Sequence, residues 1–270
     1  MAHWPYPRLV AHRGGGRLAP ENTLAAFEVG LRHGYRAAEV DAVLCADEVP
    51  VLLHDSSLER TTDGRGSVAA KTVAELAALD AGSWFHPDFA NVRIPTLLQA
   101  LRHCTERGIW LNVEIKPLAG REARTGQLVA EAVARFWADA GPTDLAAPLL
   151  SSFSRSALEA ARRSAPQLAR GLLFSSIAPD WRQALQALAC VSLHCDHRKL
   201  TRALAHEITS GGYGLLCYTV NDRRRARTLW SWGVDAICTD RIDLIRATDD
   251  PGPTVAGQRR LAKGGWSAKR

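Results

Sequence analysis

Five side chains capable of acid–base, phosphate or metal chemistry lie within one stretch, residues 9–63. They are His12, Arg13, Glu39, Asp41 and His54, and they interrupt short apolar runs. Polar groups are costly to bury without partners, so their presence in such runs indicates that the folded protein uses them. We expect these five side chains to form one site, which other parts of the chain complete.

Glu39 and Asp41 are two residues apart in a predicted strand, so their carboxylates share one face. A solvated strand face is the alternative, but Glu114 lies among similar apolar neighbours in the run LNVEIK. Carboxylates that lie close together repel unless one is protonated or a cation lies between them. Three of them predict a hard divalent cation of the Mg²⁺ or Ca²⁺ kind, with positions open to water and substrate.

Cationic side chains are predicted on both sides of this metal site. Arg13 ends the first predicted strand together with His12, before three glycines, and Lys116 follows Glu114 on the same face. A guanidinium holds a phosphate oxyanion bidentately, and an ammonium binds it as a point charge. A histidine such as His12 can also simply fill a polar gap in a core. Together with His54, however, it could supply a general base and a general acid.

Apolar runs typical of strands alternate with amphipathic helical runs along most of the chain. Strands are predicted at 9–14, 37–45, 49–55, 110–116, 148–153, 169–174, 190–195, 213–220 and 234–240. Helices are predicted at 23–34, 96–108, 122–139, 154–164, 181–188, 199–210 and 222–232, with a short helix at 241–247.

Only three residues separate Cys45 from Val49, too few for the crossover that parallel strands need. Residues 49–55 should therefore return as an antiparallel hairpin arm, which places His54 beside Asp41. Eight parallel strands remain, as in a (β/α)8 TIM barrel of the α/β class. The sequence thus predicts a single barrel domain over residues 1–250. After the hairpin of the second barrel strand comes a small insertion at about 56–95.

Composition argues against a nucleic-acid-binding protein. The chain has 270 residues and a formal net charge of +6, but five of its basic residues lie in residues 251–270, which contain no acidic residue. The remainder is nearly neutral, so no nucleic-acid partner is expected. We expect the basic tail, residues 251–270, to be disordered.

The expected environment is the cytoplasm. The N-terminal residues lack the apolar region of a secretory signal, and no run reaches the ~20 apolar residues of a membrane span. Six cysteines are scattered without a CxxC pair, which predicts reduced core thiols instead of disulfides or zinc ligands. A cytoplasmic enzyme without a membrane anchor is therefore predicted.

A series of motifs in residues 10–245 resembles the glycerophosphodiester phosphodiesterase family. They are HRGG, PENT, the Glu-x-Asp pair, HD, RTTDG, GSWF, IPTL, NVEIK, SSF, YTVN and GVDAICTD. The resemblance implies a (β/α)8 barrel that hydrolyses a small-molecule glycerophosphodiester, such as glycerophosphocholine, to glycerol 3-phosphate and an alcohol. The implied site residues are His12 and His54 as the acid–base pair, Glu39, Asp41 and Glu114 as divalent-metal ligands, and Arg13 and Lys116 as phosphate contacts. Mg²⁺ is the expected metal, with Ca²⁺ and Mn²⁺ as alternatives.

The resemblance also implies that the insertion covers the site and contributes to the glycerol pocket. Trp84 and Phe85 in the insertion, and Phe153 at a strand end, could contact substrate or pack in the core. Tyr218 stands where the family often has Trp, a change that bears on substrate fit more than on catalysis.

Two rival functions follow from the same residues. One is a related barrel phosphodiesterase that acts on lysophospholipids, with Trp84 and Phe85 as its apolar rim. The other is a non-catalytic barrel that binds a phosphate ligand. A binding protein would be expected to have lost at least one of the two histidines or three carboxylates, and all five are present.

Overall fold

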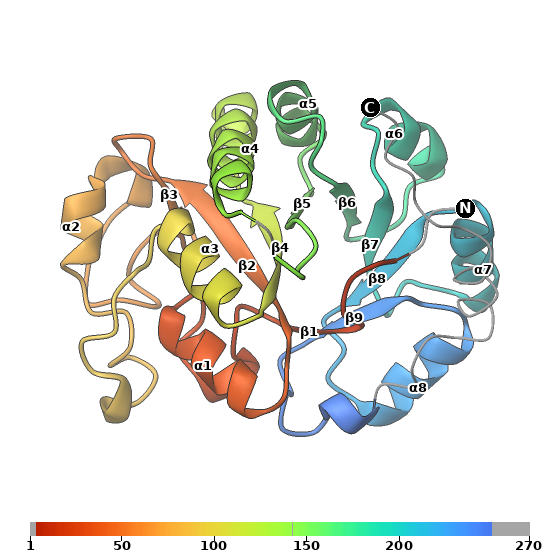
Figure 1. Cartoon of the computed structure of the whole chain (residues 1–270), viewed down its shortest axis with the longest axis horizontal. Coiled ribbons are helices and arrows are strands. Elements are labelled where there is room, and N and C mark those ends of the chain that lie inside the picture. Colours follow the sequence, from red (N-terminus) through yellow and green to blue (C-terminus); the bar gives the residue numbers. More distant parts are fainter. Residues whose placement is uncertain (1–3, 142, 250–270) are drawn as a thin grey trace.

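The computed structural model describes residues 4–141 and 143–249. Within these residues, eight parallel strands close into a barrel, and helices surround it (Figure 1). The barrel strands are β1 (Leu9–Ala11), β2 (Ala37–Leu44), β4 (Trp110–Ile115), β5 (Leu149–Ser152), β6 (Arg170–Phe174), β7 (Ser192–Asp196), β8 (Gly214–Tyr218) and β9 (Ala236–Thr239). The predicted TIM barrel is thereby confirmed.

The crossover helices follow the amphipathic runs of the sequence. They are α1 (Leu24–Arg32), α3 (Leu97–Glu106), α4 (Glu122–Asp139), α5 (Arg155–Ser164), α6 (Trp181–Ala187), α7 (Arg202–Ser210) and α8 (Arg223–Ser231). Several begin at a hydroxyl side chain that accepts a backbone N–H, such as Thr23 before α1 and Thr96 before α3. Such N-caps satisfy amide groups that the first turn leaves free and so define where each helix starts.

The barrel closes where β1 pairs with β9, in a register that places Ala11 opposite Thr239. The other edge of β1 reaches β2 only through Ala11 and Ala38. Further along β2, the strand β3 (Pro50–Leu52) pairs with the same edge as an antiparallel hairpin arm, with Leu52 opposite Ala42. The Leu53 amide donates to the Asp41 carbonyl at 3.1 Å, so the hairpin brings His54 next to Asp41, as predicted.

Apolar side chains fill the barrel and also pack between its strands and helices. The barrel interior includes Val10, Ala37, Trp110, Leu149 and Leu216, all buried. Two larger clusters join the outer faces of the strands to the helices. This packing makes the strands a rigid frame, so the positions of side chains at their carboxyl ends are well defined.

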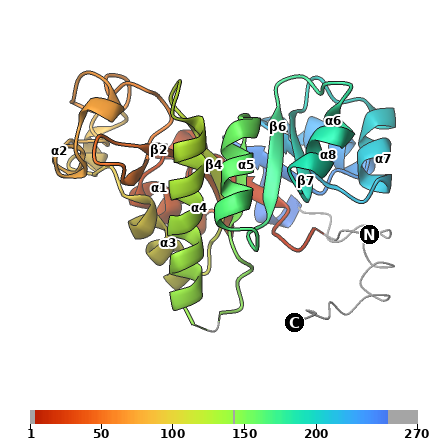
Figure 2. The same cartoon turned by 90° about the horizontal axis from the view of Figure 1, so that it is seen from above.

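The insertion between β3 and α3 has a small core of its own. It contains 3-10 helices η2 (Val68–Ala70) and η3 (Pro87–Phe89) and helix α2 (Val73–Ala77), and it projects at one end of the molecule (Figure 2). Leu58, Val68 and Leu76 pack there against β2 and β3 residues. Asp80 accepts hydrogen bonds from the amides of Gly82, Ser83 and Asn91. The loop that carries Trp84 and Phe85 is thus held in place.

The chain departs from the sequence expectations after β9. The prediction of a helix at 241–247 was wrong. This segment forms turns, and the 3-10 helix η4 covers Ala247–Asp249. Nucleating a helix is unfavourable, and so short a segment adds too few hydrogen bonds to offset that cost. The tail at 251–270 lies outside the described residues.

The structure also describes the state of the cysteines and the character of the helices. All six cysteines are buried free thiols, as predicted. Among the described residues, none of the helices combines the length and apolar character that crossing a membrane requires.

Candidate active site

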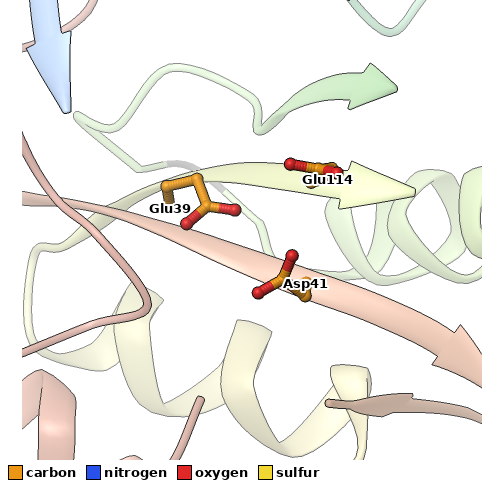
Figure 3. A group of neighbouring side chains, drawn as sticks. All are labelled: Glu39, Asp41 and Glu114. Atoms are coloured by element: carbon orange, nitrogen blue, oxygen red, sulfur yellow. The ribbon is translucent and has the colours of Figure 1, made fainter. Parts of the chain in front are cut away.

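Three carboxylates converge on the neighbouring strands β2 and β4 (Figure 3). Asp41 and Glu114 are direct register partners on the two strands. Glu39 precedes Asp41 by two residues on β2, so its side chain shares the same face of the strand. Each offers an oxygen atom, and these oxygens all lie within 4.8 Å of one another. At most 12% of any of the three side chains is exposed. The predicted acidic cluster is therefore present in the structure.

The electrostatics of the cluster fit a cation. Burial, together with the charges of the other carboxylates, raises the pKa of Glu39 well above its usual value. Burial and Asp41 raise the pKa of Glu114 to about 7. Within the described residues, the buried Glu39 Oε1 has no hydrogen-bond donor. A divalent cation bound by these hard oxygen ligands would relieve the repulsion and supply the missing partner.

The turn after β1 holds the acidic cluster from one side. The Arg13 amide donates to Glu39 Oε2 at 3.2 Å, and Arg13 Nε lies 3.4 Å from Asp41 Oδ2. Asn22, from the PENT motif, donates its side-chain amide to Asp41 Oδ2 at 2.9 Å and accepts from the Asp41 amide. Both Arg13 and Asn22 have positive φ, so this backbone is strained in order to present these groups.

His12 lies beside the cluster with each ring nitrogen near a carboxylate. Its Nδ1 is 2.6 Å from Asp240 Oδ1, and its Nε2 is 3.8 Å from Glu39 Oε2. Asp240 follows β9 and also accepts from the Asn221 side chain at 2.9 Å. Burial opposes ionisation of Asp240, but the hydrogen bond from His12 lowers its pKa to about 2. An ionised Asp240 fixes the His12 tautomer with Nδ1–H donating and leaves Nε2 facing the cluster.

His54 occupies the opposite side, beside Lys116. Its Nδ1 lies 2.7 Å from Asp55 Oδ1, and its Nε2 lies 3.2 Å from Lys116 Nζ. Lys116 Nζ is also 3.4 Å from Glu114 Oε1 and 3.9 Å from Asp41 Oδ1. Burial lowers the pKa of His54, and the attraction of Asp41 only partly offsets this effect. In a neutral His54 whose Nδ1–H donates to Asp55, Nε2 is unprotonated and accepts from Lys116.

An arginine of the insertion links the two sides of the site. Arg60 Nε donates to Asp55 at 2.5 Å, and its two terminal nitrogens donate to Glu21 at 2.8 Å. Glu21 in turn accepts from Arg13 Nη1 at 2.7 Å. Asp240, Glu21 and Arg60 were not among the predicted site residues. The PENT, RTTDG and GVDAICTD motifs that contain them were the available signal.

A pocket of about 400 Å³ opens beside His12 and Arg13. Its remaining lining comes from Gly16, Arg17, Ala19, Glu21, Arg60, Trp84, Phe85 and Asp240. The Trp84 and Phe85 rings meet edge to face, with centroids 5.7 Å apart. Trp84 and Phe85 therefore border the site instead of being confined to the core.

Phe153 and Tyr218 lie elsewhere at the ends of the barrel strands. Their rings pack edge to face with centroids 6.0 Å apart, and the Tyr218 hydroxyl donates to the Phe174 carbonyl at 2.8 Å. Neither residue lines the pocket beside His12. A role for this pair in substrate binding stays a prediction.

The chain is similar to known proteins over most of its length. The chain matches the model of the glycerophosphoryl diester phosphodiesterase family over residues 12–244. It is 30% identical to a glycerophosphodiester phosphodiesterase of Caldanaerobacter subterraneus, over 88% of this chain and 97% of that protein.

Solved structures show the same architecture. A phosphodiesterase of Oleispira antarctica, solved in complex with the product sn-glycerol-3-phosphate, superposes with a TM-score of 0.81 and 38% identity over 87% of this chain and 93% of that one. A glycerophosphodiester phosphodiesterase of Agrobacterium tumefaciens gives a TM-score of 0.71 and 26% identity, over 88% and 98% of the two chains.

Proposed function

Because the chain belongs to the glycerophosphoryl diester phosphodiesterase family, we propose that its cleft hydrolyses glycerophosphodiesters to glycerol 3-phosphate and an alcohol. The observation that carries this proposal is the acidic cluster flanked by two histidines. Each histidine has Nδ1 within 2.7 Å of a carboxylate oxygen, which leaves its Nε2 available for proton transfer.

Glu39, Asp41 and Glu114 would hold the divalent metal. We propose Mg²⁺, because the three donors are carboxylates and Mg²⁺ prefers a few oxygen ligands with water or substrate in its remaining positions. When bound, the metal supplies charge neutralisation and polarisation of the phosphate oxygens. Lys116, within 3.9 Å of Asp41 and Glu114, adds fixed positive charge next to the position of the phosphate.

Arg13 contributes in two ways. Its guanidinium pairs with Asp41 and Glu21, so it holds the acidic cluster in position. It also lines the pocket, where its charge favours an anionic phosphate.

The two histidines share the proton transfers. One accepts at Nε2 the proton of the attacking hydroxyl, either water or the glycerol 2-hydroxyl of the substrate, as the new P–O bond forms. The other donates a proton to the alcohol oxygen as the old P–O bond breaks. If the 2-hydroxyl attacks, water opens the resulting cyclic phosphate in a second step. Asp240 and Asp55 stabilise the imidazolium form of their histidines.

The class of reaction can be tested by measuring release of glycerol 3-phosphate from glycerophosphocholine with added Mg²⁺. Activity should disappear with EDTA and with His12→Ala, and the exposed His206→Ala on α7 should retain it. Full activity that survives both EDTA and His12→Ala would overturn the mechanism.

The acid can be identified with an activated substrate. A p-nitrophenyl ester of glycerol phosphate has a leaving group that needs no protonation. It should rescue the alanine variant of the histidine that acts as the acid and not that of the base. Failure to rescue either His12→Ala or His54→Ala would argue against a two-histidine mechanism.

A second candidate substrate class is the lysophospholipids. Trp84 is 40% exposed and Phe153 is 46% exposed, so apolar side chains are available outside the core at both positions. Turnover of micellar lysophosphatidylcholine above that of soluble glycerophosphocholine would favour this alternative.

A further inference from the structure

Arg17 differs from the other two arginines of the pocket. Arg13 and Arg60 donate guanidinium hydrogens to Glu21 or Asp55, and Arg13 also forms an ion pair with Asp41. The Arg17 side chain is 68% exposed, and its contact with a carboxylate is an ion pair at the 4.0 Å limit with Asp240. Within the described part of the chain, its guanidinium takes part in no hydrogen bond. This cation is therefore available to a ligand.

The backbone of Arg17 is fixed even though its guanidinium makes no hydrogen bond within the described residues. The Arg17 amide donates to the Asp240 carbonyl at 2.9 Å. The preceding Gly16 has φ +56°, and a Cβ there would lie 2.2 Å from the Asp240 carbonyl oxygen. Only glycine allows this close approach, so the loop is pinned to the end of β9. The Arg17 side chain thus extends from a backbone position that is fixed at the pocket wall.

The charges of the pocket disfavour a cationic ligand. Three guanidinium groups line it against two carboxylates, Glu21 and Asp240. Both carboxylates already accept strong hydrogen bonds, Glu21 from Arg13 and Arg60 and Asp240 from His12. Trp84 and Phe85 could stack on a quaternary ammonium. However, such a group would lie in the same pocket as the exposed guanidinium of Arg17, whose only ion pair with a carboxylate in the described residues is at the 4.0 Å limit.

The alcohol is the part of the substrate whose charge varies. The phosphate is assigned to the acidic cluster, and the glycerol moiety carries only hydroxyls. A free guanidinium in the adjoining pocket therefore matches an anionic alcohol. We propose that Arg17 is a specificity-determining residue that binds a carboxylate or phosphate on the alcohol part of the substrate. The enzyme then prefers glycerophosphodiesters whose alcohol carries an anionic group, such as the carboxylate of the zwitterionic serine, over glycerophosphocholine. This inference rests on the proposed function.

The test compares kcat/KM for glycerophosphoserine, glycerophosphoglycerol and glycerophosphocholine. Hydrogen bonds to a charged group predict a preference for serine over choline of about tenfold in the wild type. Arg17→Gln should remove most of this ratio, mainly through KM for glycerophosphoserine, and Arg17→Lys should retain part of it. The ratio should shrink at high salt, because Arg17 is exposed to solvent.

Arg65→Gln is the matched control. Arg65 is an exposed arginine of the insertion that does not line the pocket, so its loss should leave the ratio unchanged. An unchanged serine-to-choline ratio in Arg17→Gln would overturn the inference. So would an equal loss for all three substrates, which would place Arg17 at the phosphate or at the glycerol moiety that they share. The proposed function itself fails only if the wild type releases glycerol 3-phosphate from none of them.

Discussion

His12 Nδ1 lies 2.6 Å from the carboxylate of Asp240, a contact between residues at the carboxyl ends of the first and last barrel strands. The environment of His12 resembles that of catalytic histidines whose ring a carboxylate orients for proton transfer. Asp240 pairs with His12 and Asn221 and lies 4.0 Å from Arg17 Nε, whereas the acidic cluster is formed by other residues. We therefore regard Asp240 as a positioning residue.

Asp240→Asn should lower kcat by about 10²-fold or more, because general acid–base catalysis by one histidine contributes ~10²–10⁴. KM and Mg²⁺ affinity should change little, since the acidic cluster remains. Steady-state kinetics and calorimetric Mg²⁺ titration would separate the two effects. Asp243→Asn is a suitable control, because Asp243 pairs with Arg241 in the same segment. A variant with normal kcat would contradict the positioning role.

Glu39→Gln and Glu114→Gln should each weaken Mg²⁺ binding by about 100-fold or more. Changes in groups that merely support metal ligands already cost ~10–100-fold. Loss of a carboxylate should therefore have at least that effect. Isothermal titration calorimetry with Mg²⁺ measures it directly. Glu59→Gln, on the exposed part of the insertion, should bind Mg²⁺ like the wild type. Equal affinity in all three variants would rule out this cluster as the metal site.

The metal-free protein should lose the stability contribution of Glu114 as pH rises from 4.5 to about 7. The pKa of this carboxyl is raised in the folded protein from 4.5 to about 7, chiefly by burial and by Asp41. A carboxyl with a raised folded pKa stabilises the fold below its unfolded pKa, and the contribution is lost as pH rises through the folded pKa.

The measurement is the Tm of metal-free wild type minus that of Glu114→Gln between pH 4 and pH 8. This difference should fall with pH, and Mg²⁺ should raise the wild-type Tm more at pH 8 than at pH 5, because protons compete with the metal. A difference that grows with pH would show that Glu114 is ionised throughout.

Arg60→Lys should lower activity by about tenfold, because a lysine cannot donate to Asp55 and Glu21 at the same time. The side chain is 44% exposed, so the free energy of unfolding should change little. Kinetics and thermal unfolding of Arg60→Lys and the control Arg65→Lys would test this prediction. Equal activity of the two variants would show that Arg60 does not position the site.

The sequence predicted the barrel and the centre of the site because both depend on local patterns. The alternation of apolar runs gave the strands, and the short link between Cys45 and Val49 required the hairpin that places His54. Glu39, Asp41 and Glu114 could be predicted from the sequence because each occupies an inward strand position among apolar residues.

The groups that hold these side chains were harder to find. Asp240 is 228 residues from His12, and their contact exists only once β1 pairs with β9. Arg60 lies in an insertion without a regular apolar period, so sequence pattern gave no direction for its side chain. Arg17 follows a glycine whose unusual φ is set by a close approach to Asp240, a distant part of the chain.

The closure of the barrel between β1 and β9 also has a consequence for protein synthesis. The three carboxylates are all translated by residue 114, but β9, the second strand partner of β1, and Asp240, the partner of His12, follow only at residues 236–240. Until then β1 has a single strand pairing, with β2. A chain still being translated can thus assemble the acidic cluster and pair His54 with Asp55 long before Asp240 is present to orient His12. Activity would then begin only when the last barrel strand has left the ribosome.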